Sequence, residues 1–168
     1  MIYGVMSYLA VDEKVLMIKK YVRENDPNSG LYTLSGGKLE EYEKGGNPLG
    51  RLEASLREPS QETGLTLISP KLKGVILFDN NGRTFDNWKN PQDFLVYLFE
   101  SKNYSGILKE ECDEGVPLWV AEKDIPGLPK NSGDSKIYEW LKDSRYFMGV
   151  IRHKGKELDE KGTFVDYY

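Results

Sequence analysis

The sequence predicts one domain of the α+β class, in which a mixed β-sheet packs against helices, with an α/β sandwich as the alternative. Short apolar runs rich in β-branched and aromatic residues recur between turn signals, which is typical of strands. Two separated segments have instead the spacing of amphipathic helices. Such a mixture favours a layered sandwich. Because the chain has 168 residues and no stretch with a linker composition, we expect residues 1–168 to form a single domain.

Strand-like segments occur along the whole chain, and residues that favour turns separate them. The expected strands are Ile2–Ala10, Lys14–Lys20, Gly74–Phe78, Phe94–Ser101, Leu118–Ala121, Phe147–His153 and Thr163–Tyr167, with a further short strand before the glycine pair at 36–37. A polar loop, Asp79–Gln92, is expected between the third and fourth of them.

Two segments predict helices. In Leu52–Thr63 apolar residues recur four positions apart, and Gly64 follows where a helix terminator is expected. In Asp134–Leu141 the apolar residues share one stripe, and Asp134 or Ser135 can cap the N-terminus.

Composition and charge exclude several functional classes. Lys and Arg number 23 against 27 Asp and Glu, a net charge of −4, so we expect no binding to polymeric nucleic acid, which requires a basic surface. The chain has a single cysteine, Cys112, which excludes an internal disulfide. It also has a single histidine, His153, which excludes a His-rich zinc site. We expect His153 to lie on the surface. No apolar run reaches the ~18 residues of a membrane span, and the N-terminal residues lack a basic leader. We therefore expect a cytoplasmic protein, monomer or homodimer, that binds no membrane.

The residues most indicative of chemistry lie between positions 31 and 65. A glycine pair is followed by a helix that presents Glu58, Gln61 and Glu62, and these positions lie on one helical face. Two carboxylates and an amide form the hard oxygen set that Mg²⁺ or Mn²⁺ prefers, and Gly37 allows its backbone carbonyl to approach as another ligand. Because like charges this close repel each other, a bound cation is the expected compensation.

This stretch resembles the Nudix box. In that motif a glycine is followed after five residues by a glutamate, and later by an Arg-Glu pair and further acidic residues on a helix. Here Gly37 is followed after five residues by Glu43, and Arg57–Leu65 (REPSQETGL) matches the second half. The resemblance implies a Nudix-type α/β/α sandwich with a mixed sheet between helices. It also implies the metal-dependent hydrolysis of a nucleoside diphosphate linked to another group.

The resemblance assigns a role to the residues of the box by position. The acidic and amide residues of the helix would face the metal, and Glu58 and Glu62 would be catalytic. Arg57 would form a structural salt bridge with a loop glutamate, Glu43 or Glu40, because the planar guanidinium matches a carboxylate with two hydrogen bonds.

The box departs from the family motif in three ways. Thirteen residues, rather than seven, separate Glu43 from Arg57, so that Glu41–Gly50 contains an insertion, which we expect to be a loop. Gln61 stands where a glutamate usually binds metal, which should lower metal affinity. Pro59 removes one helical hydrogen bond and can kink the helix, at a cost of ~3 kcal/mol if unrelieved. A domain that binds nucleotides but hydrolyses them weakly is therefore one alternative.

The C-terminal half resembles the MutT-like oxidised-purine nucleoside triphosphatases (8-oxo-dGTP diphosphatases). The resemblance depends on the runs Glu111–Val120, Asp124–Pro126 and Tyr138–Leu141. By that match Glu114 is a further catalytic candidate for metal binding or proton transfer. A solvated acid in an acidic loop is equally consistent with the sequence.

Base recognition is expected just before the last helix, where family members carry an aromatic residue and an acid. Here Asn131 takes the place of the aromatic residue, and Asp134 could read the base edge or cap the helix. Tyr32 and Thr33, before the glycine pair, could border the base pocket. Lys38 could reach a phosphate or remain solvated.

These observations predict a Mg²⁺-dependent nucleoside triphosphate pyrophosphohydrolase, with Mn²⁺ as a possible substitute. Water would attack phosphorus and release a nucleoside monophosphate and pyrophosphate. The other hydrolase that the sequence allows is a pyrophosphatase of ADP-ribose or of a nucleotide sugar.

Overall fold

The structure, a computed structural model, describes residues 1–24, 26–45, 49–80, 92–155 and 157–168. In chain order the elements are β1 (Ile2–Val11), β2 (Lys14–Lys20), β3 (Tyr32–Thr33), β4 (Ser35–Lys38), α1 (Glu41–Lys44), α2 (Gly50–Thr63), β5 (Leu65–Ile68), β6 (Lys71–Asp79), β7 (Phe94–Ser101), β8 (Asn103–Gly106), β9 (Gly115–Ala121), the 3₁₀ helix η1 (Glu122–Gly127), α3 (Ser132–Trp140), β10 (Phe147–Lys154), β11 (Glu157–Leu158) and β12 (Phe164–Tyr167).

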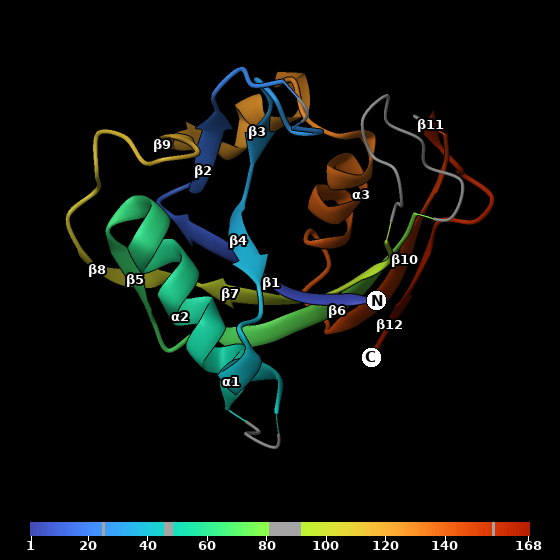
Figure 1. Ribbon diagram of the computed structural model, residues 1–168, viewed down its shortest axis with the longest axis horizontal. Helices are drawn as coiled ribbons and strands as arrows, with labels where there is room; N and C mark the ends of the chain where they lie inside the picture. Colours follow the sequence, from blue (N-terminus) through green and yellow to red (C-terminus); the bar gives the residue numbers. More distant parts are fainter. Residues whose placement is uncertain (25, 46–48, 81–91, 156) are drawn as a thin grey trace.

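A large mixed sheet forms the centre of the molecule (Figure 1). Within the described residues the strand order is β11-β10-β6-β7-β1-β2-β3, and β12, β4 and β9 pair with β10, β1 and β2, respectively. Strand β1 is parallel to β7 and β10 is parallel to β6, whereas β6 and β7 are antiparallel. A mixed sheet accompanied by a few helices confirms the predicted α+β class.

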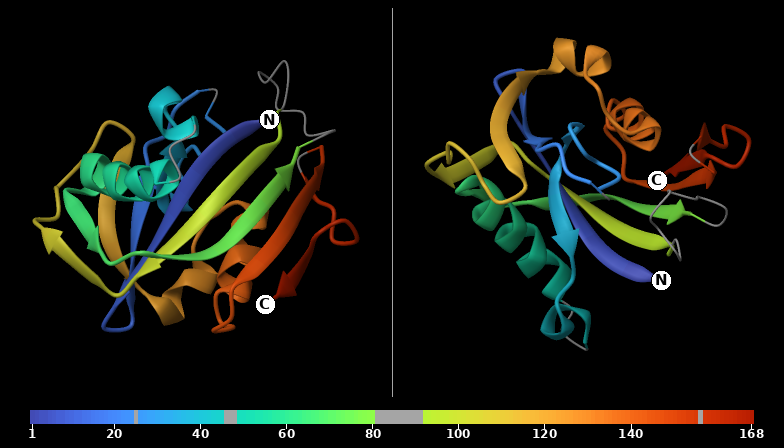
Figure 2. Two further views of the ribbon diagram at one scale, coloured as in Figure 1. Left: turned by 90° about the horizontal axis from the view of Figure 1, so that it is seen from below. Right: turned by 45° about the horizontal axis from the view of Figure 1, so that its top comes forward.

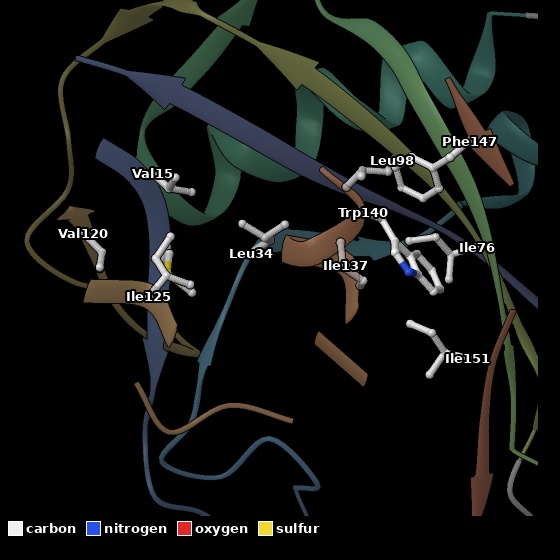
Figure 3. Close-up of a cluster of buried hydrophobic side chains, with 11 residues drawn as sticks. Val15, Leu34, Ile76, Leu98, Val120, Ile125, Ile137, Trp140, Phe147 and Ile151 are labelled. Carbon is white, nitrogen blue, oxygen red and sulfur yellow. The ribbon is translucent and has the colours of Figure 1, made fainter. Parts of the chain in front are cut away.

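The sheet separates two apolar layers, because successive residues of a strand point to opposite faces. On β7, Leu98 packs in the cluster that contains Ile137 and Trp140 of α3 (Figure 3), whereas the next residue, Phe99, packs in the cluster that contains Ala54 of α2. The helices α2 and α3 accordingly lie on opposite sides of the sheet (Figure 2). Each layer is therefore built from alternate residues of the same strands.

Helix α2 begins two residues earlier than predicted and ends at the predicted residue. It continues through Pro59, and Gly64 follows it with a left-handed backbone (φ 79°). The N–H of Gly64 donates to the carbonyl of Ser60 at 3.1 Å. Only glycine adopts this conformation without steric cost, which is why the helix ends here.

Two sequence predictions about helices are wrong. The segment Glu41–Gly50 is not a loop throughout, because Glu40 and Glu43 form a capping box that starts α1, although residues 46–48 lie outside the described part. Neither Asp134 nor Ser135 caps α3, because the N-cap is Asn131, to whose carbonyl the N–H of Asp134 donates at 3.0 Å. The carboxylate of Asp134 lies instead in the first turn, where the helix dipole favours it.

The predicted surface position of His153 is also wrong. Strand β10 has neighbours on both sides, β6 on one and β11 and β12 on the other, so it is not a free edge. Its alternate residues Phe147, Ile151 and His153 are consequently buried, with His153 only 1% exposed. Most of the predicted loop between β6 and β7 lies outside the described residues. Among the helices that the structure describes, none has the length and apolar character needed to cross a membrane.

Candidate active site

An ion pair fixes α2 against α1. The Nε and Nη2 atoms of Arg57 donate to the two carboxylate oxygens of Glu43, each at 2.8 Å. Burial by itself would raise the pKa of Glu43, but the hydrogen bonds from Arg57 hold it below its usual value. The other candidate partner, Glu40, lies farther away, with its Oε1 3.6 Å from Nη1 of Arg57. The Nη1 atom also donates to Oε1 of Glu58 at 2.7 Å, so the arginine orients the next residue of the box as well.

The carboxylate of Glu58 lies directly against the backbone of β4. A Cβ atom added to Gly37 would lie 2.5 Å from the carboxylate carbon of Glu58, so the carboxylate would have to move away. The glycine therefore permits an approach that any other residue would block. Burial raises the pKa of Glu58, and Arg57 opposes the rise.

Glu62, one helical turn further, is held by the start of β4. Its Oε2 accepts hydrogen bonds from the Ser35 hydroxyl at 2.5 Å and from the Gly36 N–H at 3.1 Å. Burial raises the pKa of Glu62 to about 7, although the hydrogen bond from Ser35 lowers it. The negative charges of Glu114 and Glu58 contribute to the rise. A nearby cation would favour the charged form of this carboxyl.

Two further predicted site residues, Gln61 and Glu114, have different surroundings. Gln61 is exposed, and its Oε1 accepts a hydrogen bond from Nη1 of Arg57 at 3.2 Å. Successive side chains of an α-helix are rotated by about 100°. Gln61 and Glu62 therefore point to opposite sides of the direction in which Glu58 points. Glu114 is paired with Lys20.

A cavity of about 340 Å³ connects this acidic region with a second group of residues on the α3 side of the sheet. The first lining group is charged or glycine: Lys20, Gly36, Gly37, Lys38, Glu62 and Glu114. The second is aromatic or polar: Phe78, Asn80, Phe94, Asn131, Asp134 and His153. We name these two groups after the parts of the nucleotide expected from the sequence, the phosphate end and the base end.

Most of the predicted substrate-binding residues line the cavity, namely Thr33, Lys38, Asn131 and Asp134. Tyr32 does not, because its ring packs against the cluster on the α3 side while its N–H donates to the Pro129 carbonyl at 2.9 Å.

Sequence reasoning missed the other members of the base end: Phe78, Asn80, Phe94 and His153. They come from three separate strands or strand ends. The only signal in the sequence was the alternation of apolar and polar residues within each strand. That alternation does not determine which strands pair, and so it does not bring these residues together.

Oxygen atoms at the phosphate end, together with those of the adjacent Glu58, which is not among the lining residues, suit a divalent cation. Glu58, Glu62 and the carbonyl of Gly37 are the oxygens that would hold it, and the close approach at Gly37 leaves them adjacent. In the described ranges, however, no three His, Cys, Asp or Glu side chains converge closely enough to hold a metal as they stand. Binding would therefore require the carboxylates to rotate toward a common centre.

Comparisons with known proteins found similar sequences and similar folds. A family model of the NUDIX domain matches residues 3–141. The uncharacterized Nudix hydrolase YvcI of Bacillus subtilis is 30% identical over 135 residues, 79% of this chain and 74% of YvcI. The MutT protein of Bacillus halodurans superposes with a TM-score of 0.78 at 24% identity, over 99% of this chain and 98% of that protein. The NUDIX domain of Shewanella oneidensis NrtR, complexed with ADP ribose, superposes with a TM-score of 0.64 at 15% identity, over 84% and 86%.

Proposed function

Because the chain belongs to the Nudix family, whose hydrolases act on phosphoric anhydrides, we propose that it is a Mg²⁺-dependent nucleoside triphosphate pyrophosphohydrolase. It would release a nucleoside monophosphate and pyrophosphate. The observation that supports this proposal is one cavity with carboxylates and lysines at one end and aromatic side chains at the other. A nucleotide has the same division into a charged phosphate chain and a flat base.

The phosphate end supplies positioning and charge. Lys20 and Lys38 would attract the phosphates, since both line the cavity. A divalent cation held by Glu58 and Glu62 would offset the phosphate charge and make the phosphorus easier to attack. Glu114 is the proposed acceptor for the proton of the attacking water, because it lines the same cavity as Glu62.

The base end suits a purine, and we propose 8-oxo-dGTP as the first substrate to test. Asn131 offers no aromatic ring, but Phe78 and Phe94, which are paired across β6 and β7, both line the cavity. Stacking on an aromatic side chain contributes ~1–3 kcal/mol per base in nucleic-acid complexes. The sheet could thus provide the apolar surface that the loop lacks.

The test is a panel of nucleotides incubated with the full chain and Mg²⁺, with products separated by ion-exchange chromatography. We expect pyrophosphate and monophosphate from triphosphates, with 8-oxo-dGTP among the best substrates. If the protein releases AMP from ADP-ribose but no pyrophosphate from any triphosphate, the result would support a pyrophosphatase of ADP-ribose or of a nucleotide sugar instead. Binding of triphosphates without products, even in the Gln61→Glu variant at high Mg²⁺, would support the weakened nucleotide-binding domain.

A further inference from the structure

We infer that Asn80 and His153 form a hydrogen-bonding end wall of the cavity and select nucleobases that present an N–H donor. This inference depends on the proposed function only in taking the ligand to be a nucleotide. His153 belongs to β10, which follows the last residue of the family match, 141. His153 would therefore supply a specificity element from outside residues 3–141, the part of this chain that the family model matches.

Strand pairing brings the two residues to the same face. In the parallel pair of β6 and β10, Phe78 is opposite Ile151. Asn80 and His153 each lie two residues further along, and residues two apart share one face of a sheet. Both line the cavity together with Phe78. The wall is therefore continuous with the aromatic surface on which a base would rest.

The amide of Asn80 is fixed with its oxygen available. Its Nδ2 donates to the Gln92 carbonyl at 3.0 Å, and its backbone N–H donates to Oδ1 of Asp93, also at 3.0 Å. Because a carbonyl only accepts hydrogen bonds, the contact with Gln92 determines which amide atom is the nitrogen. The Oδ1 atom is buried, and it has no donor among the described residues. A buried acceptor without a donor is costly, and an N–H of the ligand would satisfy it.

The imidazole of His153 packs against the first turn of α3. A Cβ atom on Gly133 would lie 3.5 Å from Cε1 and 3.6 Å from Nε2 of His153, which are ordinary contact distances, so the ring lies directly against this turn. The same turn contributes Asp134 to the cavity. An amide oxygen, a carboxylate and an imidazole in one wall form a set rich in acceptors. Such a set favours the donor-bearing edge of adenine or guanine over a base without any N–H.

The test compares the binding of non-hydrolysable α,β-methylene triphosphates by isothermal titration calorimetry in Mg²⁺. The probes carry adenine, guanine or unsubstituted purine, of which the last has no N–H donor on the base, and inorganic tripolyphosphate serves as the base-free reference. For the wild type we expect roughly tenfold or greater preference for at least one donor-bearing base over purine. Equal affinity for all three bases, or no detectable binding of any of them, would overturn the inference.

The variants assign the preference to the wall. Asn80→Leu and His153→Phe should each abolish most of the preference while leaving the affinity for tripolyphosphate unchanged, and Asn80→Asp, which keeps an acceptor, should retain it. Lys154→Gln is the matched control, because the next residue of β10 is exposed on the opposite face. If circular dichroism shows that Asn80→Leu or His153→Phe is unfolded, Asn80→Ala and His153→Leu, which also lack an acceptor, replace them with the same expected loss.

If an Asn80 variant whose new side chain lacks an acceptor is folded and still retains the full preference, the proposed role of the wall is refuted. The calorimetric experiment measures binding and not hydrolysis. A wild type that discriminates between bases but releases no pyrophosphate would therefore contradict the proposed function and leave this inference intact.

Discussion

The two ends of the cavity are assembled in different ways. At the phosphate end Glu58 and Glu62 lie one turn apart on α2, and a neighbouring strand supplies Ser35, Gly36 and Gly37. At the base end the lining residues come from the ends of β6, β7 and β10 and from the first turn of α3. Chemistry that depends on one short helix can be recognised from spacing, whereas specificity that depends on strand pairing cannot. The predictions below test whether the two ends also behave as separate units.

The largest effect is expected at the phosphate end. Glu62→Gln removes a part-buried carboxylate that accepts hydrogen bonds from Ser35 and Gly36. We expect kcat to fall roughly 10²–10³-fold, as for loss of other preorganised electrostatic groups, with little change in the affinity for the base. Steady-state kinetics and thermal unfolding would measure both effects, with Glu53→Gln, in the first turn of the same helix, as control. Unchanged turnover would remove Glu62 from the catalytic group.

The second effect concerns stability. Arg57→Ala leaves the carboxylate of Glu43 buried without its guanidinium, and breaking a buried ion pair from one side costs about 3–5 kcal/mol of unfolding free energy. Urea denaturation would measure the loss. The double variant Arg57→Ala/Glu43→Met should recover part of it, because no buried charge then remains. A loss below about 1 kcal/mol would mean that the pair behaves like an exposed one.

A third effect is a dependence of stability on pH. Burial raises the pKa of Glu62 to about 7, well above the value of an exposed carboxyl. Between the two pKa values the folded state binds more protons than the unfolded state, so this group makes the metal-free protein less stable as pH rises toward 7. Thermal unfolding in EDTA at pH 5.5 and pH 8 should show this trend, and Glu62→Gln should reduce it. Mg²⁺ should stabilise the wild type more at pH 8 than at pH 5.5. An equal gain at both pH values would argue against binding to ionised Glu62.

The smallest effect is expected from Gln61→Glu. The side chain is exposed and points toward Arg57, so an added carboxylate there is screened by solvent and attracted to the guanidinium. We expect Mg²⁺ affinity to rise only about two- to fivefold in a titration of turnover against metal concentration. A rise of a hundredfold or more would show that position 61 rotates to coordinate the metal directly.

Sequence reasoning succeeded where local rules decide the structure. The helix ending at Gly64 and the major strands follow from periodicity and turn signals, and glycine at position 37 allows a close contact with its backbone, as expected. It missed β5 and β8, because each is a strand of four residues with too little alternation to detect. It also missed α1, whose four residues form a helix only because Glu43 is tied to Arg57 and to the capping box.

The base end could not be predicted for a different reason. His153 appears in a run of basic residues and has the pattern of a surface position. Its burial follows from the parallel pairing of β10 with β6, a contact between segments about seventy residues apart that one sequence does not encode locally. The same pairing places it on the face that Asn80 shares.

The most direct test of the central claim is the binding of Mn²⁺, measured by electron paramagnetic resonance, to the wild type and to Glu62→Gln in the presence of a non-hydrolysable nucleotide. The account predicts that the wild type binds the ion and that the variant loses most of the affinity, while both still bind the base-containing ligand. Equal Mn²⁺ affinity in the two proteins would contradict the claim that the carboxylates of α2 hold the metal.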